Sequence, residues 1–289
     1  MEKILSTIMV ALAAWSVQAQ SNNQLAIPLT SPNERGMLEV SQINGDIIIE
    51  GYDGKEVIVN WEIGTGKNKM KGGGDDARAV LAEVHEKEKY KDKYGSKPDV
   101  SGMKRIESNP VEIQAEEEDN FVEISTESWK RRVDLTIKVP KDFDLSVGTI
   151  HGVVEISNVS GEMEVSNVNG PIRMESVEGS VLANTVNGEL VVQLKSVIAG
   201  KEMSFANLNG AVDVTFPANV KATAKMKTDR GDIYTDFDMT TENIREEERD
   251  DNGQYSVSIN SLTRGLINGG GPTFTFRNMN GDIIIRKGN

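Results

Sequence analysis

Aspartate and glutamate are the residue types of this chain that are numerous enough, and chemically suited, to support catalysis. The sequence has 45 aspartates and glutamates but only two histidines and no cysteine, which excludes thiol nucleophiles and thiolate metal sites. A pair of carboxylates could hydrolyse a glycosidic bond. The acids that directly follow repeat glycines are spread along the chain, at Asp46, Glu162, Glu189, Asp232 and Asp282. We therefore predict no catalytic residue, no metal site and no cofactor, and a polysaccharide-acting enzyme is the least favoured function.

The charge balance excludes a further class of partner. The 32 basic and 45 acidic residues give a net charge of −13, which repels phosphate backbones. The sequence also lacks a basic stripe with interleaved aromatic residues, the pattern typical of nucleic-acid binding. We expect no nucleic-acid partner.

A nine-residue repeat organises the elements that carry these side chains. The clearest run of glycines at this spacing is Gly152, Gly161, Gly170, Gly179 and Gly188. The same frame recurs in units that contain Gly36, Gly45, Gly210, Gly231 and Gly281. With the glycine as position zero, positions two, four and seven are apolar in most units. In the unit of Gly152 these residues are Val154, Ile156 and Val159.

Each unit reads as one short β-strand and one turn. Positions two and four alternate with polar residues, as a half-buried strand requires, and we expect position seven to return to the core after a bend. Asn-Gly pairs such as Asn169-Gly170 place two residues that tolerate positive φ at the corner. The pattern favours a β-solenoid, because stacked strands need a constant residue count. An antiparallel β meander or sandwich, with Asn-Gly hairpins, is the alternative.

Two segments interrupt the repeat of a single all-β domain that we place at residues 20–289. Residues 64–110 are glycine-rich at first, and helix-forming residues from Asp75 to Tyr94 then predict one inserted, largely solvated α-helix. Residues 240–260 predict an acidic hairpin excursion. Residues 116–120, in a segment of plain two-residue alternation, read as a solvated acidic turn.

Residues 1–19 have the layout of a secretory signal peptide. Lys3 precedes an apolar run, and Val17 and Ala19 precede a cleavage point at Gln20. The run is short for a membrane span, and we expect no transmembrane segment in the mature chain. Without cysteine the protein is not expected to be a lipoprotein. These features predict export to the periplasm, the cell surface or the extracellular space.

The repeat resembles that of the bacterial toastrack family. The resemblance is carried by glycine-anchored units such as Val168-Asn169-Gly170-Pro171-Ile172 and Asn280-Gly281-Asp282-Ile283-Ile284-Ile285, and it covers about residues 36–60 and 130–289. Members are domains of unknown function that are often labelled adhesins. The resemblance implies an exported or envelope-associated β-solenoid, in some cases beside envelope-stress regulators, and it implies no catalytic residue.

A binding or adhesion module of the envelope is therefore the leading hypothesis, with an unidentified protein or glycan as partner. Position three is often acidic, but Arg173, Leu182 and Val191 break this pattern and predict a contact patch around residues 173–191. A structural, assembly or envelope-stress accessory role is the alternative. Ile283-Ile284-Ile285 would then form an uncapped C-terminal strand through which copies self-associate.

Overall fold

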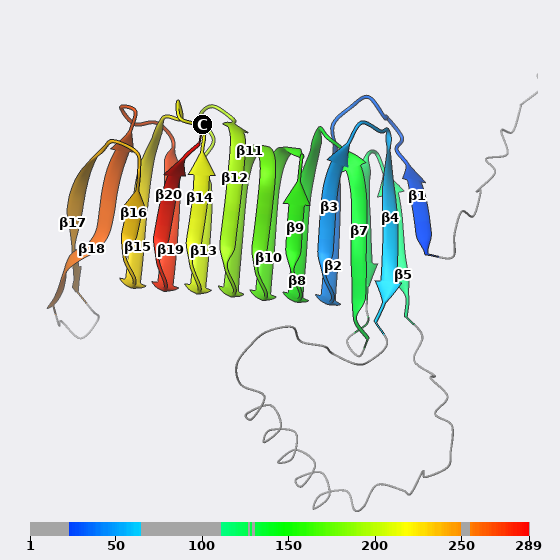
Figure 1. The fold of residues 1–289 in the computed structure, drawn as a ribbon, viewed down its shortest axis with the longest axis horizontal. Helices are drawn as coiled ribbons and strands as arrows, with labels where there is room; N and C mark the ends of the chain where they lie inside the picture. Colours follow the sequence, from blue (N-terminus) through cyan, green and yellow to red (C-terminus); the bar gives the residue numbers. More distant parts are fainter. Residues whose placement is uncertain (1–22, 65–110, 127, 129–130, 250–254, 289) are drawn as a thin grey trace, which may run out of the picture.

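The computed structural model describes residues 23–64, 111–126, 128, 131–249 and 255–288. These residues form 20 strands in one hydrogen-bonded sheet and no helix (Figure 1). The predicted all-β class is confirmed. The predicted signal peptide, and the helix predicted from Asp75 to Tyr94, lie outside the described residues.

Many of the strands stack side by side in a parallel ladder, which we call the first ladder. In order along the stack its parallel strands are β6 (Phe121–Thr126), β2 (Gly36–Asn44), β8 (Phe143–His151), β10 (Ser160–Asn169), the second half of β11 (Ile172–Asn187), β13 (Met203–Asn209), β19 (Thr273–Asn280) and β15 (Ala222–Arg230). Antiparallel strands extend both ends. β5 (Ile113–Glu118) pairs with β6, while β18 (Tyr255–Ile267) and then β17 (Met239–Arg249) follow β15.

A second parallel ladder runs beside the first. Its parallel strands are β7 (Val133–Pro140), β3 (Ile47–Tyr52), β9 (Val154–Ser157), the first half of β11, β12 (Leu190–Val197), β14 (Val212–Phe216), β20 (Ile283–Lys287) and β16 (Ile233–Thr235). At one end β4 (Glu56–Ile63) and then β1 (Gln24–Pro28) add antiparallel strands. The chain alternates between the two ladders, and a repeat glycine marks the corner between them.

The central strands that pair are two repeat units apart. Gly161 pairs with Gly179, and Ile172 pairs with Val154, so the offset is 18 residues. These pairings between repeat units are parallel. In the described residues antiparallel pairing is confined to the end strands, so the antiparallel meander does not describe the repeat.

The repeat units nearest the two termini lie inside the stack rather than at its ends (Figure 1). β2 is inserted between β6 and β8, and β20 is inserted between β14 and β16. Ile283 and Ile285 of β20 are fully buried. The prediction that copies self-associate through an uncapped C-terminal strand is therefore wrong in its geometry, because both edges of β20 are already paired.

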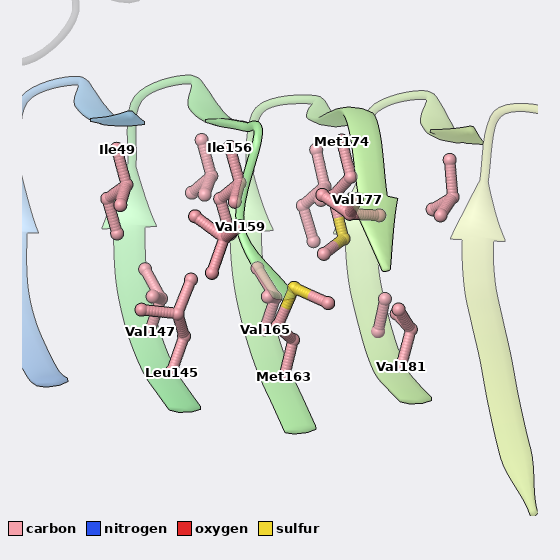
Figure 2. Packing of buried hydrophobic residues seen from close by; sticks show 14 of the residues in the cluster. Ile49, Leu145, Val147, Ile156, Val159, Met163, Val165, Met174, Val177 and Val181 are labelled. Carbon is pink, nitrogen blue, oxygen red and sulfur yellow. The ribbon is translucent and has the colours of Figure 1, made fainter. Parts of the chain in front are cut away.

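The core confirms the predicted strand periodicity at positions two and four. Figure 2 shows Leu145, Val147, Met163 and Val165 packed together inside the ladders, and each is at most 2 % exposed. Such interdigitated aliphatic side chains supply most of the stabilisation of a thin, layered fold.

Position seven is buried in only some of the units. Val159 and Val177 are buried as predicted, but the prediction is wrong for Ile150, Val168 and Leu208, which are exposed. The cause is strand parity. The first-ladder strands run on past position seven, so strict alternation points that odd position outward. After β9 the backbone instead bends through a residue with positive φ, Asn158, and the next side chain, Val159, returns to the core.

The corner glycines pack directly on the backbone of the neighbouring strand pair. A Cβ on Gly170 would lie 1.8 Å from the carbonyl oxygen of Gly152, and Gly170 has a φ of +151°. Gly152 makes the same approach to Gly45. The asparagine of the predicted Asn-Gly corner does not adopt positive φ, so its role there is different from the one predicted.

The acidic β5–β6 turn binds the N-terminal loop. The Glu117 carboxylate accepts hydrogen bonds from the backbone N–H of Thr30 (3.0 Å) and of Asn120 (3.0 Å). The buried side chain of Asn120 accepts from Ser31 N and donates to Ser31 O, both at 2.7 Å. The hydrogen bond from Thr30, followed by that from Asn120, outweighs burial and lowers the pKa of Glu117. The turn that was predicted to be solvated thus forms a hydrogen-bonded contact with the N-terminal loop.

We predict that Gly170→Ala lowers the free energy of unfolding by more than about 2 kcal/mol, because the steric clash adds to backbone strain of about 1–3 kcal/mol. Gly148→Ala is the matched control. Its Cβ would meet only ordinary contacts at 3.5 Å or more, so we expect a change within about 1 kcal/mol. Urea unfolding followed by circular dichroism measures both, and equal losses would contradict the role of the corner.

We predict that Glu117→Gln destabilises the protein at neutral pH but not in acid. The pKa of Glu117 is lowered on folding, so its contribution is complete above the unfolded value near 4.5 and is lost as the pH falls through the lower folded value. The difference in Tm between wild type and variant should therefore shrink as the pH falls below 4.5. Glu116→Gln, on the same strand, is the control. A Tm difference that stays constant with pH would count against a role for the charged Glu117 carboxylate in this contact.

Candidate contact surface

A row of buried polar side chains inside the first ladder includes asparagines that hydrogen-bond to the carbonyl groups of corner glycines. At position six the strands carry amides or hydroxyls, and Asn167, Asn207 and Asn278 each donate from Nδ2 to the carbonyl oxygen of a corner glycine at 2.8 Å. The buried members are Gln42, Thr126, Thr149, Asn167, Thr185, Asn207 and Asn278. This row was missed from the sequence because its residue types vary and it occurs only in alternate units.

A second polar row lies two residues later, on the surface. Asn187 Nδ2 donates to Asn169 Oδ1 at 2.9 Å, and Asn209 and Asn280 extend the same chain of hydrogen bonds at 2.8 Å per step. His151 Nδ1 lies 3.3 Å from Asn169 Nδ2 at one end. We call this the amide row, and its members are His151, Asn169, Asn187, Asn209, Asn280 and Arg230. The corner asparagines therefore form a hydrogen-bonded row of amides on the surface.

An exposed apolar ridge runs beside the amide row. It consists of the outward position-seven residues of six neighbouring strands, which are Ile43, Ile150, Val168, Val186, Leu208 and Met279. Ile43 and Val186 are half-buried, and the other four are between 38 % and 46 % exposed. With strands about 4.8 Å apart, the ridge is about 24 Å long. A contiguous exposed apolar surface of this kind marks an interaction site more often than scattered apolar residues do.

The predicted contact residues lie on two different ladders. Arg173 and Val191 are register partners on β11 and β12 of the second ladder, and Arg173 Nη2 lies 3.6 Å from Glu189 Oε2. Leu182 lies on the second half of β11, in the first ladder, where it is 46 % exposed. The structure thus brings Arg173 and Val191 together and places Leu182 on the ladder that carries the ridge.

Several acids considered for chemistry instead bind backbone groups between neighbouring strands. Asp46 Oδ1 accepts from Val153 N at 2.8 Å, and Asp282 Oδ1 accepts from Asp232 N at 2.9 Å. Arg132 forms ion pairs with Asp46 and with Asp134. Burial opposes the Arg132 charge, but these two carboxylates outweigh it and raise the pKa of Arg132. These contacts give the carboxylates a structural use at the corner.

The described residues hold no cluster of three or more histidine, aspartate or glutamate side chains arranged to bind a metal ion. Nor do they contain a helix with the length and hydropathy that a membrane span needs. The repeat glycines Gly36 and Gly161 lie at the start of the first-ladder strands β2 and β10, and Gly179 lies within β11, where that strand joins the first ladder. A Cβ on Gly161 would lie 2.3 Å from Phe143 O, and one on Gly179 would lie 1.9 Å from Gly161 O. The remaining predicted corner glycines, Gly45, Gly152, Gly170, Gly188, Gly210, Gly231 and Gly281, pack on the backbone of a neighbouring strand pair.

Comparison with known proteins confirms the toastrack resemblance. Residues 130–263 match the model of the family described as Toastrack DUF4097. A crystal structure from Clostridium sporogenes, described as a putative cell adhesion protein, is 12 % identical, with a TM-score of 0.45 over 92 % of this chain and 99 % of that chain. No curated protein matches the chain.

We predict that the two asparagine rows differ in their effect on stability. Asn167 is 2 % exposed, and Asn167→Ala removes a buried hydrogen bond to Gly152, which should cost about 1–3 kcal/mol. Asn169→Ala deletes the same group from the more accessible amide row and should cost within about 0.5 kcal/mol. Thermal unfolding compares the two. Equal losses would indicate that the amide row is structural rather than available for contacts.

Proposed function

We propose, from the toastrack segment and the outer face of the first ladder, that this protein is an exported, non-enzymatic binding module of the cell envelope with an adhesion-like role. The observation that carries the proposal is the apolar ridge beside the amide row, continuous over six strands. The periplasm or the cell surface is the expected location, since residues 1–19 have the layout of a signal peptide.

The ridge and the amide row complement each other as a binding surface. Covering an exposed aliphatic side chain contributes up to about 1.5–3 kcal/mol. An amide within the row, such as that of Asn187, donates one N–H to one neighbour and accepts one hydrogen bond from the other. Its second N–H and its remaining oxygen lone pair can bind a partner. The surface therefore offers apolar contact and directional hydrogen bonds along the same line.

The non-enzymatic part of the proposal is supported by the use of the carboxylates. Asp46, Asp134 and Asp282 accept backbone N–H groups of adjacent strands, and Asp213 holds Arg286 in a bidentate pair with contacts of 2.8 Å. Acids committed in this way stabilise the stack, whereas a glycosidase needs one carboxyl kept protonated near its working pH.

We also infer that the two ladders are the sides of a β-solenoid in which one coil contains two nine-residue units. The support is the 18-residue offset between paired strands, which keeps Gly170 over Gly152 and Ile172 over Val154. Such a solenoid presents one residue of each type at every coil, so rows such as the ridge follow from the repeat.

We predict that Val168→Asp together with Leu208→Asp weakens binding of the mature protein to isolated cell envelopes of its own bacterium at least about tenfold. A loss of about 1.4 kcal/mol is enough for this change. Co-sedimentation with the envelopes measures it. Val191→Asp, a single change of the same kind on the second ladder, is the control and should leave binding within twofold.

The variants separate the two candidate surfaces. If Val191→Asp weakens binding and the ridge variant does not, the contact patch lies on the second ladder, around Arg173 and Val191. If neither variant changes the binding of folded protein, neither surface is the site. Circular dichroism confirms that each variant is folded.

A further inference from the structure

The fold assembles a basic patch that is not evident in the sequence. Lys227 on β15 is the register partner of Arg277 on β19, and Lys225 on β15 is the register partner of Arg264 on β18. The patch, defined as Lys225, Lys227, Arg264 and Arg277, lies at the β15 end of the first ladder. Its residues come from three separate segments, because β19 is inserted beside β15 and β18 folds back along the other edge.

Two like-charged pairs on adjacent strands have an electrostatic cost. Paired strands lie about 4.8 Å apart, and like charges directly opposite each other are destabilising. Lys225, Arg264 and Arg277 are exposed, and Lys227 is half-buried. The acids nearest in register and sequence are Glu242, which is the partner of Arg264, and Asp229. Lys227 has an interaction of its own, and among the described side chains the three exposed cations Lys225, Arg264 and Arg277 outnumber these two acids, in a protein whose net charge is −13.

A shallow hollow adjoins the patch where the apolar ridge ends. Its volume is about 290 Å³, and it is lined by Asn207, Lys227, Asp229, Arg277, Asn278 and Met279. Met279 is the last residue of the ridge, and Asn280 of the amide row follows it in sequence. The volume is at the low end of small-ligand sites, which suits one sugar unit with its acidic group rather than an entire ligand.

We propose that the basic patch and its hollow bind the acidic groups of a polysaccharide whose chain continues along the amide row. This inference rests on the proposed function and names the partner class for the same face. Arginine and lysine provide charge-assisted hydrogen bonds to carboxylate or sulfate groups, and the amides of Asn209 and Asn280 are placed to bind neutral hydroxyls.

The rest of the face disfavours a nucleic acid. Glu39, Glu123 and Glu164 occupy the outward row that leads away from Lys225, so a uniformly charged phosphate backbone would be repelled beyond the patch. Among the described outward residues of the first-ladder strands, the aromatic side chain is that of Phe121, at the opposite end. On the described outward face of these strands, bases would thus find no ring to stack on beside the patch. A polysaccharide with spaced acidic groups avoids both conflicts.

The test measures binding of the mature protein to polygalacturonate and to dextran sulfate, with neutral dextran, highly methyl-esterified pectin and duplex DNA as comparison probes. We expect binding to the two acidic polysaccharides at 50 mM salt, a loss of at least tenfold at 500 mM salt, and no binding to neutral dextran. Methyl-esterified pectin should bind at least tenfold more weakly than polygalacturonate, because esterification removes the carboxylate charge.

The variant Lys225→Gln with Arg277→Gln should bind the acidic polysaccharides at least tenfold more weakly than wild type. The control, Lys55→Gln with Lys195→Gln, removes the same charge from exposed sites outside the patch and should bind within twofold of wild type. Equal loss in both variants, equal binding of neutral dextran, tighter binding of DNA, or no binding to either acidic probe would each overturn the proposal.

The envelope assay distinguishes this failure from failure of the proposed function. If the ridge variant loses envelope binding while neither acidic polysaccharide binds, the binding module stands and the acidic polysaccharide is wrong. If the patch variant loses polysaccharide binding while the ridge variant keeps full envelope binding, the patch stands and the ridge is not the contact surface.

Discussion

The structure depends on the close approach of one corner glycine to the carbonyl oxygen of the next. Gly170 leaves no space for a side chain above Gly152, and Gly152 leaves none above Gly45. This approach lets Gly170 N donate to Asn187 O at 2.8 Å, so the backbone ladder continues around the corner. With the corner fixed, the paired strands keep their 18-residue offset, and residues at equal positions must stack.

The same constraint explains why asparagine occurs both inside and outside the corner. A tight turn exposes a carbonyl that has no partner within its own strand, and the buried Asn167 satisfies the oxygen of Gly152. On the outside, Asn169 and Asn187 stack at equal heights and hydrogen-bond to each other. One interaction supports the fold, and the other leaves polar groups at the surface.

Much of the fold could be predicted from the sequence because the corner fixes local spacing. The nine-residue period, the strands and the buried positions two and four follow from it, as Leu145 and Val147 illustrate. The sequence could not predict in which units the side chain at position seven is buried and in which it is exposed. This depends on the ladder that a unit joins and on bends such as the one at Asn158. A repeat also does not specify the order in which its units stack in space. The sequence therefore could not show that the strand of Ile283 and Ile285 lies inside the stack rather than at its end.

The candidate site was predictable only in part, for a related reason. Stacking places residues such as Arg277 and Lys227 side by side although they are 50 residues apart, and this neighbourhood arises from the insertion of β19. Outward positions are also free of the packing constraint. The fold needs apolar residues at positions two and four, but it is indifferent to polarity at the outward position seven. Strand propensity favours Ile and Val at such positions, but it does not require a continuous row from Ile43 through Val168 to Met279 on six neighbouring strands, and this continuity is why we propose the ridge as a binding surface.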